Sequence, residues 1–409
     1  MERTVARRLG VLLLVVSTAL GVVAAGTAPR GNEPVRVLFV GNSYTYFHNL
    51  PEMFAGLASA GGRPVETRMV APGGWRLKDH WEKGEARKAL AERTWDYVVL
   101  QDQSTLGVTL FVEGKARVSS DRVFRPSADQ WAAEARKAGA RPVFYLTWAR
   151  KASPEDQDTL THAYMSAARD SRALVSPVGL AWRRVRDERP AIELFEPDGS
   201  HPSPSGTYLA ACTFYAALFD KDPRGLPETV SGQPVDLETE QVQAGKRTVL
   251  AKLSAEHARV MQHAAWQAWQ AVKKSGGYIE VKPLSPGLPP LPAPRAVPAA
   301  ALAGNWTGTL VMHPAGPIDM VLSLEKAAPG WSGRIELKAE KPDAASVADL
   351  AVADGDIRFV LPASTAIAGL RVQFRGVAVS ATELRGTAEA AGADPDAPLR
   401  LLGSWRLTR

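Results

Sequence analysis

The chain has 409 residues, of which 45% are hydrophobic and 22% charged, and its formal net charge is +6 at pH 7. This composition is typical of globular proteins and excludes a disordered chain. The basic residues are too scattered to favour nucleic-acid binding. Because the length exceeds what one hydrophobic core usually organises, we expect more than one domain.

The first segment has the pattern of a secretory signal peptide. Three arginines precede an apolar run over residues 9–23, and small residues follow it. Cleavage after Ala25 satisfies the small-x-small rule, and Ala28 is an alternative site. We expect residues 1–25 to be removed on export, after which the protein has no stable membrane insertion. An uncleaved N-terminal anchor is the alternative.

Residues 33–220 alternate short apolar segments with longer amphipathic ones, which is typical of βαβ units around a parallel sheet. We therefore predict a three-layer α/β/α domain. The predicted strands are Val35–Gly41, Val65–Val70, Tyr97–Gln101, Pro142–Thr147 and Leu174–Val178. The predicted helices lie around Leu50–Ala60, Leu77–Arg93, Ser127–Ala138, Pro154–Ser171 and Ser203–Phe219.

Three further segments follow this domain. Residues 221–281 lack strand patterns, and Glu238–Lys273 is predicted as one or two helices of a helical extension. Residues 282–299 are rich in proline, which is typical of a semi-rigid linker. In residues 300–409 the apolar pattern has period two with glycine punctuation, which predicts a small antiparallel β-barrel. Its Gly-x-Trp-x-Gly stretches indicate strand ends and core tryptophans rather than ligand contacts.

A serine directly follows the first predicted strand, in the segment Gly41-Asn-Ser43-Tyr-Thr45. The end of a buried strand is where α/β sheets place their ligands, and Gly41 permits a tight turn. The alternative role for Ser43 is capping of the next helix.

The segment Asp198-Gly-Ser-His201-Pro202 follows the last predicted strand. A serine nucleophile needs a neutral imidazole to take its proton, and a carboxylate to hold that ring. The alternative is a loop histidine beside a helix cap. Because both segments open on the carboxyl edge of the sheet, we expect Ser43, His201 and Asp198 to act together.

Residues 35–219 resemble the SGNH/GDSL serine hydrolases. The turn Gly41–Thr45, the segment Leu100-Gln-Asp-Gln-Ser104 and the ending Asp198-x-x-His201 are similar to the blocks of a divergent bacterial branch. The resemblance implies a flavodoxin-like order of five parallel strands. It also implies acyl transfer by Ser43, with His201 as base, Asp198 as its partner, and neither a cofactor nor a metal.

The resemblance further implies an oxyanion hole. Two donors match the backbone N–H groups of Ser43 and Gly74, with Gly73 as the alternative to Gly74. The third donor of the family is usually an asparagine side chain, and Gln103 is its positional match here. Three other residues are candidates for the substrate cleft, with packing as the alternative: Asn42, which replaces the family's usual aspartate, Trp75 and His80.

These patterns predict an exported serine esterase, a carboxylesterase or acetylesterase in the periplasm or outside the cell. It would hydrolyse an oxygen ester through an acyl-enzyme, and fold analogy suggests O-acetyl groups on a glycan. The expected partners are small-molecule or glycan esters, with no nucleic acid. The alternative is an inactive SGNH-fold binding protein, which the departures at Asn42 and Gln103 allow. A glycan-recognition role for the barrel of an active enzyme is a further hypothesis.

Overall fold

The computed structural model describes residues 33–118, 121–313, 316–328, 330–392 and 399–409. The signal peptide predicted at residues 1–25 lies outside these ranges. Within them, the structure contains no helix with the length and apolar character needed to cross a membrane.

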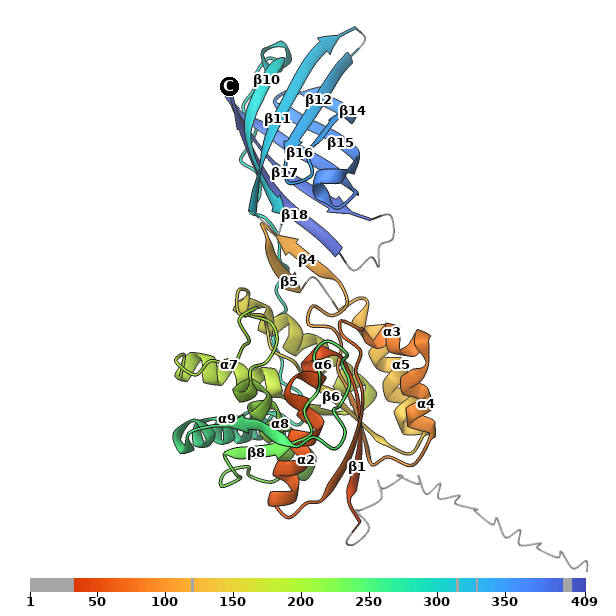
Figure 1. Ribbon diagram of the computed structural model, residues 1–409. Helices are drawn as coiled ribbons and strands as arrows, with labels where there is room; N and C mark the ends of the chain where they lie inside the picture. The colour runs from red at the N-terminus through yellow and green to blue at the C-terminus, as the bar shows by residue number, and fades with distance from the viewer. Residues whose placement is uncertain (1–32, 119–120, 314–315, 329, 393–398) are drawn as a thin grey trace, which may run out of the picture. The chain divides into compact units, whose positions relative to one another are not determined.

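Within the described ranges, the first sheet has five parallel strands in the order β2-β1-β3-β6-β7 (Figure 1). They are β1 (Val35–Val40), β2 (Val65–Val70), β3 (Tyr97–Leu100), β6 (Arg141–Tyr145) and β7 (Leu174–Ser176). The register places Val40 of β1 opposite Leu100 of β3. This is the predicted flavodoxin-like order, in which the chain reverses direction across the sheet beside β1. Ligands bind at the carboxyl edge of such a switch point.

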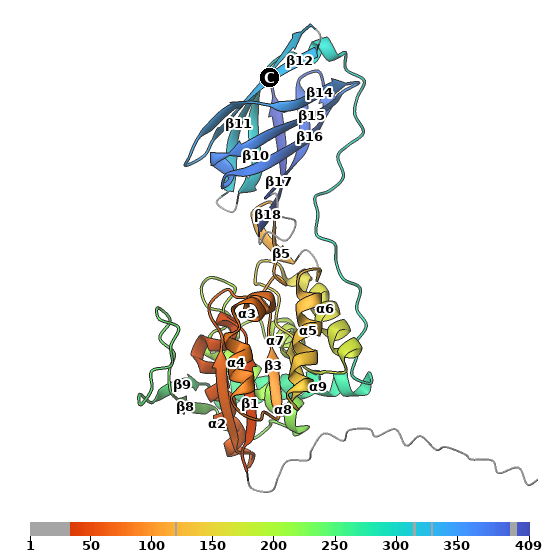
Figure 2. The same ribbon diagram turned by 90° about the vertical axis from the view of Figure 1, so that its right-hand side faces the viewer.

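Helices cover both faces of this sheet, so the predicted three layers are confirmed. The helices are α1 (Ser43–Tyr46), α2 (Leu50–Ala60), α3 (Leu77–Lys83), α4 (Glu85–Ala91), α5 (Phe124–Lys137), α6 (Gln157–Ser171), α7 (Val178–Glu188) and α8 (Pro204–Phe219). Helices α3, α4 and α5 lie on one face, and α2 and α8 pack together on the other (Figures 1 and 2). The single helix predicted at Leu77–Arg93 is wrong, because Gly84 has a φ of +81° and separates α3 from α4. Glycine adopts this conformation readily because it has no Cβ.

Residues 221–281 are not the purely helical extension that was predicted. Strands β8 (Thr229–Gly232) and β9 (Thr248–Lys252) form an antiparallel pair, and α9 (Ala255–Lys274) follows. An isolated bridge joins Val235 and Val242 in the loop between the strands. The two strands are too short to produce a clear period-two pattern, so the sequence did not reveal them.

The C-terminal residues form an antiparallel, nearly closed sheet, which agrees with the predicted barrel. Trp306 and Trp405 are buried in its core. A Cβ atom on Gly386 would lie 2.0 Å from Cε2 of Trp405, so the glycine makes room for the indole ring. In spatial order the strands are β13 (Asp343–Ser346), β12 (Gly330–Lys338), β11 (Gly316–Ala327), β10 (Gly304–His313), β18 (Leu399–Thr408), β17 (Glu383–Ala391), β16 (Leu370–Ser380), β15 (Asp356–Ser364) and β14 (Ala348–Ala353).

A hairpin that the sequence pattern did not predict follows β3. Its strands are β4 (Thr109–Val112) and β5 (Lys115–Val118), and β4 also pairs in parallel with β18. By their internal contacts, residues 34–409 form one compact unit. The domain limits drawn from the sequence therefore stay predictions.

Candidate active site

Ser43 lies at the turn between β1 and the short helix α1. Asn42 is the N-cap of this helix, and its Oδ1 accepts a hydrogen bond from the N–H of Tyr44 at 3.1 Å. The first N–H groups of a helix have no acceptor within the helix. Accordingly, the N–H of Ser43 has no hydrogen-bond partner among the described residues. This N–H is available to a ligand at the mouth of the turn.

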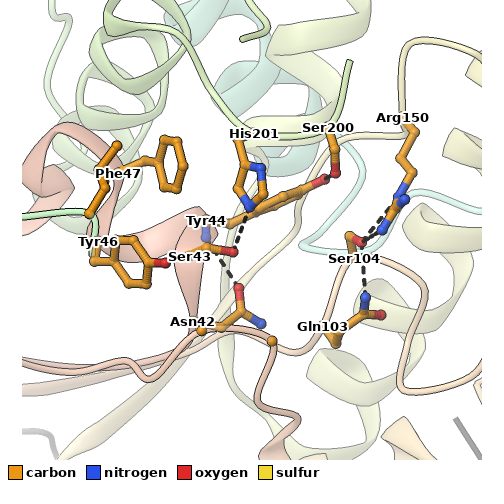
Figure 3. Close-up of a pocket in the computed structure, with 13 residues that line it drawn as sticks. Asn42, Ser43, Tyr44, Tyr46, Phe47, Gln103, Ser104, Arg150, Ser200 and His201 are labelled. Atoms are coloured by element: carbon orange, nitrogen blue, oxygen red, sulfur yellow. Dashed lines mark hydrogen bonds between the residues drawn. The ribbon is translucent and has the colours of Figure 1, made fainter. Parts of the chain in front are cut away.

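The structure brings Ser43, His201 and Asp198 into one hydrogen-bonded chain, of which Figure 3 shows the contact between His201 and Ser43. Nε2 of His201 lies 2.9 Å from Oγ of Ser43, and Nδ1 of His201 is hydrogen-bonded to Oδ2 of Asp198. The other carboxylate oxygen accepts the N–H groups of Ser200 at 2.8 Å and of His201 at 3.0 Å. In the tautomer with the proton on Nδ1, Nε2 can accept the proton of the serine hydroxyl.

The electrostatics of Asp198 keep it charged beside His201. Partial burial acts to raise its pKa, but hydrogen bonds from the His201 side chain and from two backbone N–H groups outweigh burial. The pKa of Asp198 is therefore lowered below its ordinary value. A charged carboxylate in this place stabilises the imidazolium that forms when His201 takes a proton.

Aromatic rings hold the imidazole of His201 in place. Phe47 stacks on it, with ring centroids 4.3 Å apart and an interplanar angle of 10°. Tyr44 meets the same ring edge-on and stacks in turn on Trp148. The hydroxyl of Tyr44 lies 2.8 Å from Oγ of Ser200. This packing leaves the ring little freedom to rotate away from Ser43.

The two glycines after β2 differ in what their N–H groups contact. The N–H of Gly73 donates to Oε2 of Glu240 at 2.9 Å, so this donor is already engaged. The N–H of Gly74 has no partner among the described residues. Gly74 has a φ of +71°, and a Cβ there would meet no atom within 4 Å, so its conformation rather than crowding calls for glycine. Of the two glycines, Gly74 is therefore the one whose N–H is available to a ligand.

The side-chain amide of Gln103 has a fixed orientation. Its Oε1 accepts hydrogen bonds from the N–H of Thr105 at 2.7 Å and from the Thr105 hydroxyl at 2.6 Å. Its Nε2 therefore faces the other way, and donates to Oγ of Ser104 at 3.3 Å (Figure 3). An amide nitrogen carries two hydrogens, so one remains for a ligand.

Asn42 and Gln101 form a reciprocal amide pair beneath the nucleophile turn. Nε2 of Gln101 donates to Oδ1 of Asn42 at 2.9 Å, and the N–H of Asn42 donates to Oε1 of Gln101 at 2.8 Å. Nδ2 of Asn42 donates to the carbonyl of Trp75 at 2.8 Å. An aspartate could not make this last bond, because a carboxylate has no donor. Asn42 therefore makes a hydrogen bond in this network that the family's usual aspartate could not make.

Two of the residues predicted for the cleft lie elsewhere. His80 is fully buried, and its Nε2 is 2.7 Å from the carbonyl oxygen of Gly41. Burial lowers the pKa of His80 to about 4, so the ring is neutral and Nε2–H is the donor. Trp75 packs edge-on against His80. Neither residue lines the pocket at Ser43. Instead, His80 binds the carbonyl of Gly41, and the carbonyl of Trp75 accepts a hydrogen bond from Asn42, so both contact the backbone or side chains of the turn that carries Ser43.

A pocket of about 340 Å³ opens at Ser43. Of the predicted residues it contains Asn42, Ser43, Gly74, Gln103 and His201, together with Gly73. The sequence reasoning missed seven lining residues: Tyr44, Tyr46, Phe47, Ser104, Arg150, Ser200 and Leu237. Arg150 follows the carboxyl end of β6, a position that could have identified it.

Within the described part of the chain, no group of three or more His, Cys, Asp or Glu residues could hold a metal ion.

Comparisons with known proteins extend over part of the chain. No family model and no curated protein matches the sequence. A solved protein from Slackia heliotrinireducens, described as a candidate SGNH hydrolase, is 30% identical; the match covers 46% of this chain and 100% of that one, with a TM-score of 0.39. A DUF4886 family protein from Bacteroides uniformis is 20% identical, with coverage of 62% and 98% and a TM-score of 0.42. The acetyl xylan esterase AlAXEase is 14% identical, with coverage of 45% and 100% and a TM-score of 0.36.

The order of the parallel sheet and the chain of Ser43, His201 and Asp198 at its carboxyl edge define the class of SGNH hydrolases. The match to the 30% identical protein spans that protein's whole length. This chain therefore belongs to the SGNH hydrolase superfamily.

Proposed function

We propose that the protein is a serine esterase in which Ser43 attacks an oxygen ester. The observation that supports this proposal is the 2.9 Å contact between Nε2 of His201 and Oγ of Ser43. His201 takes the hydroxyl proton as Oγ bonds to the ester carbon, and returns it to the leaving alcohol. Water, activated by His201, then cleaves the acyl-enzyme and releases the acid with Ser43 restored.

The negative charge that develops on the carbonyl oxygen needs donors already aimed at it. The candidates are the N–H groups of Ser43 and Gly74 and the amide Nε2 of Gln103. The first two have no other partner among the described residues, and the amide of Gln103 is held by Thr105. Such donors stabilise the tetrahedral intermediate without reorganising during the reaction.

The substrate that we propose is a small acyl ester, with O-acetyl groups on a glycan as the leading example. The pocket of about 340 Å³ is at the lower end of the range of ligand sites, which suits a short acyl group and part of its alcohol. The signal-peptide pattern of residues 1–25 supports export to the periplasm or the medium. The reaction as written needs no cofactor.

Hydrolysis of p-nitrophenyl acetate and longer esters by the chain without residues 1–25 tests this proposal. Ser43→Ala should lower kcat by ~10⁴-fold or more, because the nucleophile is lost. The matched control is Ser59→Ala, since Ser59 is an exposed serine of α2. An organophosphonate probe should label the wild type and the control, but not Ser43→Ala. Equal rates and equal labelling in all three proteins would reject the esterase and leave the binding-protein hypothesis.

A further inference from the structure

Arg150 is a partly buried cation in the wall of the Ser43 pocket. Its backbone is held on both sides: the N–H of Ala149 donates to Oε1 of Gln157 at 2.9 Å, and the N–H of Lys151 donates to the carbonyl of Gly199 at 2.8 Å. The second bond ties Arg150 to the loop that carries Asp198 and His201. The position of the arginine is therefore linked to that of the proposed base.

The guanidinium of Arg150 has unused donors. Its Nη2 and Nε lie 2.9 and 3.3 Å from Oγ of Ser104, and Figure 3 shows both pointing to this one hydroxyl. A guanidinium carries five N–H donors. Among the described residues, no carboxylate accepts any of them. A partly buried cation without a counter-charge is unfavourable unless a ligand supplies one.

Three other partly buried arginines of the parallel-sheet region do have a counter-charge. Each donates to a carboxylate through its guanidinium: Arg76 to Asp79, Arg117 to Asp156, and Arg125 to Asp129. The side chains of these arginines are 18%, 14% and 27% exposed. Unlike these three, Arg150 has only a neutral hydroxyl as the hydrogen-bond partner of its guanidinium among the described residues. Arg63 and Arg186 are also partly buried without a carboxylate partner, but they lie outside the Ser43 pocket, whereas Arg150 lines it.

The pocket contains no acid that could neutralise Arg150. None of its lining residues is an aspartate or a glutamate. Three carboxylates next to lining residues have other partners: Asp198 binds His201, Glu240 accepts the N–H of Gly73 and the hydroxyl of Tyr46, and Asp102 accepts the N–H groups of Leu77 and Gln103. A ligand in this pocket is therefore the group that could supply a counter-charge to Arg150.

We propose that Arg150 binds a carboxylate of the substrate, so that the enzyme selects acidic esters. This inference rests on the proposed esterase function. A guanidinium matches a carboxylate through two parallel hydrogen bonds, which gives direction as well as charge. Because Ser43 and Arg150 line the same pocket of about 340 Å³, the carboxylate lies a few bonds from the scissile carbonyl. It belongs either to the alcohol part, as in an O-acetylated uronic acid, or to the acyl part, as in a succinyl ester.

Two matched substrate pairs distinguish these sources. For the alcohol part, acetate release is measured from tetra-O-acetylglucuronic acid and from its neutral methyl ester. For the acyl part, ethanol release is measured from monoethyl succinate and from ethyl levulinate, which replaces the carboxylate with a neutral acetyl group. In one pair, we expect the wild type to favour the acid by about tenfold or more in kcat/KM, the range of a charged hydrogen bond.

Arg150→Gln should lower that acid-to-neutral ratio by ~10- to 100-fold, mainly through KM of the acid, and Arg150→Lys should recover part of it. The control is Arg184→Gln, since Arg184 lies on α7 and pairs with Glu188. An independent measurement uses the wild type alone: glucuronate or succinate should inhibit p-nitrophenyl acetate hydrolysis at about tenfold lower concentration than its methyl ester.

Failure of this inference differs from failure of the esterase. If the neutral esters are hydrolysed in a Ser43-dependent way, while neither acid is preferred and Arg150→Gln leaves both ratios unchanged, the carboxylate site is rejected and the esterase stands. If the acids inhibit no more strongly than their methyl esters do, the carboxylate site is rejected as well. If no ester is hydrolysed and no serine is labelled, the esterase is rejected, and the inference with it.

Discussion

The parallel sheet and the C-terminal antiparallel sheet bury different kinds of side chain. Around the parallel sheet, buried polar groups such as Asn42, Gln101 and His80 are hydrogen-bonded at the carboxyl ends of strands. In the antiparallel sheet, Ser364 is the one buried polar side chain among the described residues, and the core consists of apolar groups such as Trp306. Loops that converge on one edge can assemble a reacting site, whereas a continuous ladder with an apolar interior mainly provides stability.

The sharpest test of this comparison is a cavity in the antiparallel sheet. Trp405→Ala removes a buried indole, and should lower the free energy of unfolding of this sheet by ~3–5 kcal/mol. Urea denaturation followed by circular dichroism measures the loss. Trp331→Ala is the control, because Trp331 is only half-buried and should cost less. Esterase activity per folded molecule should not change in either variant. A parallel loss of activity would show that the two regions do not act separately.

The next test concerns the polar network of the parallel sheet. Gln103→Ala removes a proposed oxyanion donor, and should lower kcat by ~10²–10³-fold with little change in KM. Steady-state kinetics with p-nitrophenyl acetate measures this. Thr105→Val leaves the Gln103 amide in place but removes one of the two bonds that orient it, so its effect should be smaller. A Gln103→Ala variant with the wild-type kcat would contradict the role of Gln103.

The third test uses pH and the buried His80. Burial lowers the pKa of His80 from 6.5 to about 4. As pH falls, the imidazole of His80 is therefore protonated in the unfolded chain at a higher pH than in the folded protein. The contribution of neutral His80 is complete above pH ~6.5 and is lost as pH falls toward 4, a change of about 3 kcal/mol.

His80→Gln keeps a donor for the carbonyl of Gly41 but does not titrate. Between pH 7 and pH 4, its free energy of unfolding should therefore fall by about 3 kcal/mol less than that of the wild type. Urea titrations at several pH values measure the difference. His257→Gln, at an exposed position of α9, should follow the wild type. Identical slopes for all three proteins would show that His80 is not buried in its neutral form.

Local sequence patterns were enough to predict much of the framework. Strand β2 and helix α2 have the bounds that were predicted, because hydrophobic periodicity and end signals act over a few residues. Asp198 and His201 could be paired from their spacing alone, since three residues of chain already hold them close. Ser43 could be placed at the edge of the sheet because it directly follows a buried strand.

Contacts between distant segments were decided only by the tertiary structure. The choice of Gly74 over Gly73 depends on Glu240, which reaches Gly73 from a loop that was predicted to be helical. The contact of Arg150 with Ser104 joins loops after two different strands. His80 lies behind the nucleophile turn because α3 packs there, and no spacing in the sequence indicates this. Periodicity and capping describe a segment by itself, whereas these contacts depend on which segments the folded chain brings together.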